Sequence, residues 1–211
     1  FKSFASIVLL REQHLNTLGG IMAIAGIDYS LTCPAICVFT GEQTDRFTYD
    51  KCLFYFLSDV RKHAKTVDTN IHGTFNSGFD EECQRYQSIS DWAVDKVIGC
   101  EDVAIEGYAY NAKGRVFHIA ENTGILKYKL WESRIPYTIL PPSKPKKIAT
   151  GRGNANKVDM YAAFKEETGQ SLYGFFNINP VGNKVANPIS DIVDAYYICK
   201  TFHMMRKKDG L

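Results

Sequence analysis

The feature that most constrains this 211-residue chain is a short apolar run that ends on an acid. Residues 23–28 read AIAGID, in which small and branched apolar side chains are followed directly by Asp28. A continuous apolar run of this length is typical of a buried β-strand. A carboxylate at the end of such a strand is costly to bury unless something compensates its charge. The pattern therefore predicts a buried sheet with a special role for Asp28.

The rest of the chain predicts further strands and then an alternation of helices and strands. Apolar residues 35–40 and the alternating residues 45–50 favour a three-stranded meander, whereas the polar residues 61–84 are interpreted as a loop. Two more strands are predicted over 102–108 and 137–142, and helices over 85–98, 113–134, 157–169 and from Pro188 onward. A chain that begins with strands and continues with alternating helices and strands is predicted to form a mixed α/β domain.

Composition indicates one globular domain. The chain is 45% hydrophobic and carries a net charge of only +2, so a nucleic-acid partner would need clustered charge. We expect a domain over residues 22–205, with 1–21 a candidate N-terminal extension and 206–211 a basic tail. The six cysteines form no CxxC pair, which favours reduced thiols over disulfides or zinc. The early apolar run ASIVLL is too short to cross a bilayer, so we expect a soluble, cytoplasmic protein without a membrane partner.

Four acids occur where burial would penalise them. Asp28 and Glu106 each follow an apolar strand, and Asp191 and Asp194 are spaced to share one face of the last helix. If these elements meet, the crowded carboxylates repel one another unless divalent cations neutralise them, and oxygen ligands suit Mg²⁺ or Mn²⁺. Alternatively, Asp28 is a turn former, Glu106 an exposed strand end and Asp191 an acid favoured by the helix dipole.

Positive charge gathers in residues 143–157, a segment without an acid that we interpret as a loop between strand and helix. Its glycines would let the backbone approach a phosphate. Aromatic and basic residues also follow Glu106, where rings could stack on an unpaired base. The alternative is a solvated loop and ordinary packing of tyrosine on the sheet. The candidate DNA-binding residues are Tyr108, Tyr110, Lys113, Arg115, Lys144, Lys146, Lys147, Arg152, Asn154 and Lys157.

Four motifs together resemble the RuvC-type Holliday-junction resolvases of the ribonuclease H-like superfamily, particularly small phage versions. They are AGIDYSLT, VAIEGYAY, ATGRGNANKVDM and SDIVDAYYI, in the order found in that family. The resemblance implies a five-stranded mixed sheet flanked by helices on both sides. It also implies a homodimer that cuts four-way DNA junctions with two Mg²⁺ ions, for which Mn²⁺ can substitute.

The resemblance also implies the roles of individual residues. Asp28, Glu106 and Asp194 would be catalytic metal ligands, and Asp191 occupies a ligand position at which family members vary. Lys157 and the loop before it would contact phosphate near the active site.

Three other interpretations remain open at this point. A related nuclease that cuts RNA/DNA hybrids or flaps would carry the same acids. A catalytically inactive DNA-binding relative would keep the fold, although the intact acid set argues against it. GIDYSLT also resembles the first phosphate loop of actin-like and Hsp70-like nucleotide-binding domains, but the chain has no second glycine-rich phosphate loop.

Overall fold

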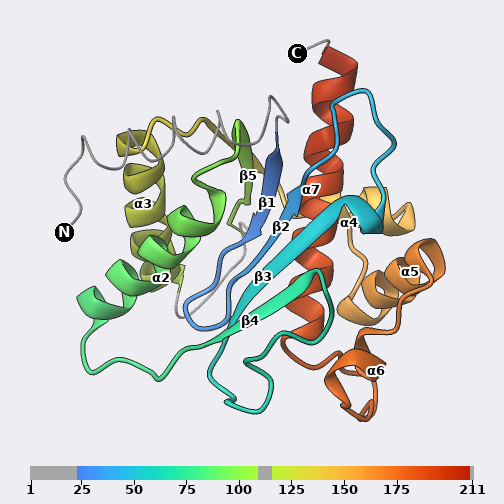
Figure 1. The fold of residues 1–211 in the computed structure, drawn as a ribbon, viewed down its shortest axis with the longest axis horizontal. Helices are drawn as coiled ribbons and strands as arrows, with labels where there is room; N and C mark the ends of the chain where they lie inside the picture. The colour runs from blue at the N-terminus through green and yellow to red at the C-terminus, as the bar shows by residue number, and fades with distance from the viewer. Residues whose placement is uncertain (1–22, 109–115, 210–211) are drawn as a thin grey trace.

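The computed structural model describes residues 23–108 and 116–209, in which a six-stranded sheet runs through the middle of the molecule (Figure 1). The strand order is β4-β3-β2-β1-β5-β6. The strands β1, β2 and β3 form an antiparallel meander, and the other neighbours pair in parallel. The strands are β1 (Ile24–Asp28), β2 (Ala35–Phe39), β3 (Cys52–Ser58), β4 (Ile71–Phe75), β5 (Asp102–Glu106) and β6 (Tyr137–Leu140).

Helices cover both faces of this sheet and divide the hydrophobic core into two layers (Figure 1). On one face lie α2 (Glu82–Val97) and α3 (Val116–Glu132). On the other face α7 (Ile189–Asp209) crosses the sheet, joined by α4 (Ser143–Thr150), α5 (Lys157–Thr168) and the short α6 (Leu172–Phe176). The predicted mixed α/β class, with helices on both faces, is confirmed.

The helix α7 lies directly against β1 because Gly26 has no side chain. A Cβ atom added at Gly26 would lie only 2.2 Å from the backbone nitrogen of Cys199 and 2.8 Å from the carbonyl oxygen of Ala195. Alternation along β1 directs Ala25 and Ile27 into the layer beneath α2 and α3, whereas Gly26 faces α7. The backbone of α7 is therefore held close to the strand that ends at Asp28.

The structure corrects three predictions about local elements. The third strand is Cys52–Ser58, not 45–50, although the predicted meander does form. Residues 61–84 are not all loop: they contain β4, and α2 begins at Glu82. The sheet therefore has six strands where five were expected. The basic segment is also more ordered than predicted, because α4 occupies Ser143–Thr150 and ends at Gly151 in the left-handed conformation.

The predicted helices are otherwise confirmed. The helix α5 begins with a capping box between Asn156 and Asp159 and ends at Gly169, whose φ of 71° is left-handed. The helix α3 continues through Gly124. Arg206 to Lys208, the start of the expected basic tail, belong to the last turns of α7. All six cysteines are free thiols. Within the described ranges, no helix has the length and apolar character needed to span a membrane.

Candidate metal centre and nucleic-acid interface

Sheet register brings the first two acids together. The strands β1 and β5 are parallel, with Ile27 opposite Ile105, so Asp28 and Glu106 end neighbouring strands at the same edge of the sheet. Asp28 lies two residues after Gly26, and Glu106 lies two residues after Ala104. Because side chains two residues apart in a strand share a face, both carboxylates lie on the α7 side of the sheet, as Gly26 and Ala104 do. Two distant segments of the chain thus place two carboxylates side by side above one edge.

The first turns of α7 bring the other two acids to this edge. Asp191 and Asp194 both act electrostatically on Asp28, and Asp194 also acts on Glu106. The side chain of Asp191 is only 8% exposed, and its Oδ2 atom is buried without a hydrogen-bond partner. The Ser190 hydroxyl lies 3.0 Å from Asp191 Oδ1 and 2.7 Å from Asn187 Oδ1, and it can donate its proton to either. The structure thus places the four carboxylates near enough for their charges to influence one another.

Lys157 lies among these acids at the start of α5. Its Nζ atom is 3.7 Å from Asp191 Oδ1 and 3.9 Å from Asp194 Oδ2, and it donates a 3.0 Å hydrogen bond to the Ser190 hydroxyl. The side chain is nevertheless 55% exposed. An exposed ammonium group tethered to the acids can also reach an anion that arrives from solvent.

The electrostatics of the site favour the neutral carboxylic acids. Burial, together with the charges of Asp194, Asp191 and Glu106, raises the pKa of Asp28 well above its usual range. Burial and the Asp194 charge raise the pKa of Glu106 to about 7. Burial raises the pKa of Asp191 to about 6 although Lys157 opposes the shift, and burial also raises the pKa of Asp194. Burial lowers the pKa of Lys157, but Asp191, Asp194 and the other two acids outweigh it and leave that pKa raised.

The donor set fits hard divalent cations in its chemistry. All four side chains offer carboxylate oxygens, the ligands that Mg²⁺ and Mn²⁺ prefer. The unpartnered Oδ2 of Asp191 is the kind of buried oxygen that an ion would satisfy. Across residues 23–108 and 116–209, no group of three or more His, Cys, Asp or Glu side chains is already arranged closely enough to hold an ion.

Only some residues of the basic segment 143–157 lie near the acids of the site. Lys146 is near enough to lower the pKa of both Glu106 and Asp194. Arg152 instead forms a 2.9 Å ion pair with Asp159, and Lys144 Nζ lies 3.8 Å from the sulfur of Met205. Two further candidates, Lys147 and Asn154, are exposed.

The aromatic candidate Tyr108 lies against α3. Its hydroxyl donates a 3.4 Å hydrogen bond to the carbonyl oxygen of Ala120, and Lys127 Nζ lies 5.3 Å from its ring centre. The ring is therefore partly engaged by α3, whereas the packing alternative placed it on the sheet. Tyr110, Lys113 and Arg115 fall outside the described residues.

Sequence reasoning missed the residues that hold the site in place. Ser190 lies inside the SDIVD motif, so its position next to Asp191 was a usable signal. The buried Asn122 of α3 had no such signal: it accepts a 3.2 Å hydrogen bond from the Tyr29 hydroxyl and donates a 3.4 Å bond to the Ser30 carbonyl. Asn122 thus anchors the two residues that follow Asp28.

Comparison with known proteins identifies the class of fold. The Thermus thermophilus RuvC structure aligns with a TM-score of 0.54 at 15% identity, covering 88% of this chain and 98% of that one. T. thermophilus RuvC in complex with a Holliday junction substrate aligns with a TM-score of 0.57 at 16% identity, covering 88% and 97%. The yeast mitochondrial Holliday junction resolvase aligns with a TM-score of 0.52 at 12% identity, covering 99% and 96%.

These structures define the chain as a ribonuclease H-like α/β fold of the type found in RuvC resolvases. No protein-family model and no curated protein matches the sequence. The expected fold is thereby confirmed through structure alone, with one more strand than predicted.

Proposed function

We propose that this protein is a metal-dependent endonuclease that resolves four-way DNA junctions. The observation that carries the proposal is the convergence of Asp28, Glu106, Asp191 and Asp194 at one edge of a RuvC-like sheet. Four carboxylates whose pKa values are all raised by burial, and in three cases also by a neighbouring acid, are a costly arrangement for stability alone. Such an arrangement suits a site that binds divalent cations and acts on a phosphodiester.

The four acids would hold two Mg²⁺ ions, or Mn²⁺ in their place. When bound, such a pair supplies an activated water and stabilises the leaving oxygen of a phosphodiester. The exposed Lys157 ammonium group would attract and orient the scissile phosphate, and Lys146 would add positive charge beside Glu106. The hydroxyl of Ser190 would keep the Asp191 carboxylate oriented.

The substrate we propose is branched DNA, bound by a homodimer whose two-fold symmetry matches that of a junction. One of the similar structures, T. thermophilus RuvC, is described in complex with a Holliday junction substrate. The basic residues of α4 and the exposed Asn154 would contact DNA phosphates. The resemblance to small phage enzymes suggests a viral origin and branched replication DNA as the setting, in the cytoplasm of the host.

A cleavage assay with four substrates tests this proposal. The protein is incubated with Mg²⁺ and a four-way junction, a matched duplex, a flap or an RNA/DNA hybrid. We expect paired symmetric nicks in the junction, absent with Asp28→Asn and retained with Asp95→Asn, a matched change at a side chain that is 64% exposed. Preferential cutting of the hybrid or flap would replace the substrate but keep the chemistry. Junction binding without any cutting would favour the inactive DNA-binding relative.

A further inference from the structure

The loop between β3 and β4 carries positive charge that the candidate site does not use. This β3–β4 loop comprises residues 59–70, and its central residues VRKHAKTV contain no acid. The side chains of Arg61, Lys62 and Lys65 are exposed, and none of them pairs with an acid in the part of the chain that the structure describes. Burial and the charges of Lys62 and Lys65 lower the pKa of His63 between them. The loop therefore presents a positive surface to solvent.

Contacts with β4 fix the conformation of the β3–β4 loop. The backbone N–H of Gly73 donates a 3.2 Å hydrogen bond to the carbonyl oxygen of Lys65. A Cβ atom added at Gly73 would lie only 2.8 Å from the backbone nitrogen of Lys65, so the loop can cross the strand this closely because a glycine lies there. The guanidinium carbon of Arg61 lies 4.1 Å from the centre of the Phe75 ring. The protein's own contacts thus hold the cations in place before a partner binds.

The β3–β4 loop lies on the same face of the sheet as the acids. Gly73, against which the loop packs, is paired with Phe56, a residue of the core layer beneath α7. Val67 of the loop packs against this same layer. Asp28 and Glu106 are also on the α7 side of the sheet. One molecule bound over this face could therefore contact both the acids and the loop.

The loop also begins at the edge of the sheet where the acids lie. Because β1 and β3 are both antiparallel to β2, Ser58 ends β3 at the same edge at which Asp28 ends β1. The Cys33 thiol donates a 3.7 Å hydrogen bond to Oδ1 of Asp59, the first residue of the loop. Burial raises the pKa of this thiol, and the charges of Asp59 and Asp191 add to the shift. Cys33 thus lies near both the loop and an acid of the site.

We propose that the β3–β4 loop binds the phosphate backbone of the DNA strand whose phosphate lies at the acids, about three to four nucleotides along that strand. Neighbouring strands of a sheet are about 4.8 Å apart, and β3 is two strands from β1, so the loop begins about 10 Å from Asp28. One DNA strand advances about 3.4 Å per nucleotide along the duplex axis. The helix α4 follows β6, on the other side of β1, so the acids lie between two cationic elements.

The chemistry of the loop favours phosphate over bases. Its exposed ammonium and guanidinium groups contact phosphate oxygens whatever the base sequence. The two acids of the loop are engaged within the protein: Asp59 accepts the hydrogen bond from Cys33, and Asp68 accepts a 2.7 Å hydrogen bond from the backbone N–H of Thr69. This inference deepens the proposed function, on which it rests for the identity of the partner.

The first test measures binding of a fluorescent four-way junction to the full-length protein in EDTA, over a range of salt concentrations. We expect the double variant Lys62→Gln, Lys65→Gln to bind at least about fivefold more weakly, with a slope of log affinity against log salt that is smaller by about 2. Both side chains are exposed, so the melting temperature should not change.

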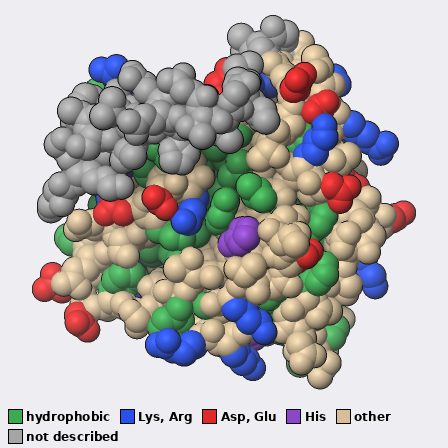
Figure 2. All heavy atoms as spheres, in the orientation of Figure 1, with side chains coloured by type: hydrophobic (Ala, Val, Ile, Leu, Met, Phe, Trp, Pro, Cys, Tyr) green, Lys and Arg blue, Asp and Glu red, His purple; other side chains and the backbone are tan. Residues whose placement is uncertain are grey.

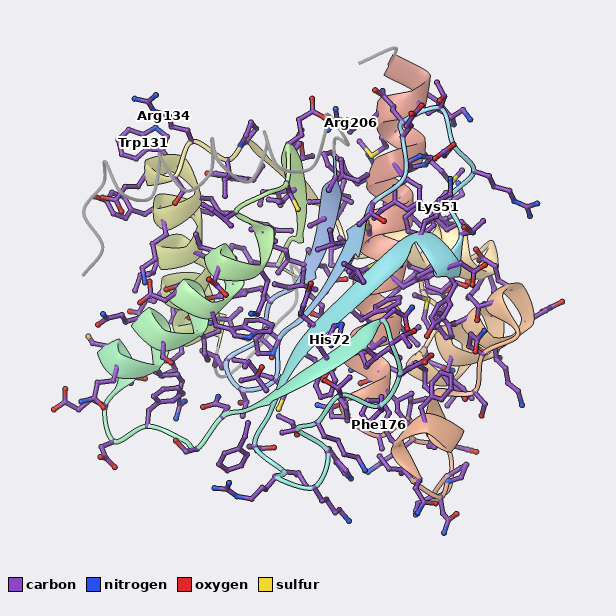
Figure 3. The ribbon with its side chains drawn as sticks, viewed as in Figure 1. Lys51, His72, Trp131, Arg134, Phe176 and Arg206 are labelled. Atoms are coloured by element: carbon purple, nitrogen blue, oxygen red, sulfur yellow. The ribbon has the colours of Figure 1, made fainter. Side chains whose placement is uncertain are left out.

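A matched double variant controls for the loss of two charges. Lys51→Gln with Lys208→Gln removes the same charge from exposed positions near the start of β3 and the end of α7. Figure 3 shows Lys51 and Arg206, near these two positions, in the upper part of the view, whereas the β3–β4 loop runs along the bottom in Figure 1. The control should bind like the natural protein. An equal loss of affinity in both double variants, or no loss in the loop variant, overturns the proposal.

The second test locates the contact on the DNA. Junctions with one uncharged methylphosphonate linkage, moved stepwise along a strand, are bound to the natural protein, the loop double variant and Lys157→Gln. A linkage whose neutralisation no longer weakens binding once a lysine is removed is the phosphate that this lysine contacts. The linkage coupled to the loop should lie about three to four nucleotides from the one coupled to Lys157, on the same strand. Coupling of the loop to no linkage, or to one on another strand, contradicts the proposal.

The two proposals fail in different ways, because neither test involves cleavage. Junction binding that the loop variant leaves unchanged would refute this inference and leave the proposed function standing. Weaker binding by the loop variant, in a protein that cuts none of the substrates, would refute the proposed function alone. A natural protein that binds no DNA would refute both.

Discussion

At the scale of single residues, the surroundings of the site disfavour the charged form of its acids. The pKa of Glu106 is raised from an ordinary 4.5 to about 7 by burial and by the Asp194 charge. In the metal-free protein the folded state therefore binds this proton more tightly than the unfolded state does. The free energy of unfolding should fall as the pH rises from about 4.5 to about 7, and level off above that range.

Urea denaturation in EDTA at several pH values measures this effect. Across that window, Glu106→Gln should be less sensitive to pH than the natural protein, with a difference on the order of 1–3 kcal/mol. Other groups titrate in the same range, Asp191 among them, so the comparison between the two proteins is the informative quantity. Equal slopes in both proteins would contradict the raised pKa of Glu106.

Asp28→Asn should separate stability from metal binding. Removing one of four crowded charges should raise the melting temperature of the metal-free protein, because the remaining acids are repelled less. Added Mg²⁺ should raise the melting temperature of the natural protein, by linkage, and have little effect on the variant. Asp95→Asn serves as control and should respond to Mg²⁺ like the natural protein. An equal response of Asp28→Asn would argue against Asp28 as a ligand.

At the scale of elements, the close contact between β1 and α7 sets the geometry of the site. Gly26→Ala would place a methyl group into the backbone of α7 at Cys199 and Ala195, which cannot give way as a flexible side chain can. We expect a loss of about 3 kcal/mol or more of unfolding free energy, at the upper end of overpacking effects. Gly174→Ala is the control, because its methyl group would make only an ordinary 3.6 Å contact with Ser171. Thermal or urea unfolding of both variants measures the difference.

The elements that could be predicted from sequence are those in which the spacing of apolar residues matches the faces that the fold buries. The strand β1 and the helices α2, α5 and α7 were found because apolar runs, helical spacing and end signals agree there. The strand β3 was misplaced because residues 45–50 happen to alternate, whereas CLFYFLS is apolar almost throughout. The edge strand β4 was missed because His72, Gly73 and Thr74 give it little apolar pattern.

The acids of the candidate site could be proposed from their own positions in the sequence, whereas Lys157 was expected near the active site only through the family resemblance. The position of each acid at a strand end or on one helix face was enough to predict that the four carboxylates converge. A lysine paired with two of them leaves no such local pattern. The basic residues of 143–157 looked equivalent in sequence, but the helix α4 and the ion pair of Arg152 with Asp159 give them different surroundings. Side-chain pairing across elements depends on tertiary structure, which periodicity does not report.

At the scale of the whole molecule, the proposed DNA binding should depend strongly on salt, because it would rely on local clusters of basic residues. Figure 2 shows Lys and Arg side chains along the lower margin of this face, and Figure 1 shows the loop after β3 on that side of the molecule. This loop carries the exposed residues Arg61, Lys62 and Lys65. The strands β1, β3 and β5 all end at this edge of the sheet.

Salt titrations of binding test which cations contact DNA. Lys147→Gln should weaken binding to junction and duplex alike and reduce the slope of log affinity against log salt by about 1. Lys96→Gln, close to the end of α2 that leads to the start of β5, should leave that slope unchanged. Unchanged slopes in both variants would remove Lys147 from the DNA contact.

The order in which the site is assembled follows from where its parts lie along the chain. Asp28 ends the first strand and Asp194 lies in the last helix, and β1 needs both β5 and α7 beside it before the carboxylates can meet. Contacts between such distant segments form late in folding, because long loops must close first. During synthesis, a ribosome-bound chain whose last helix has not emerged would hold only part of the cluster. The nuclease proposed above would therefore gain its complete set of acids only when the last helix has joined the sheet.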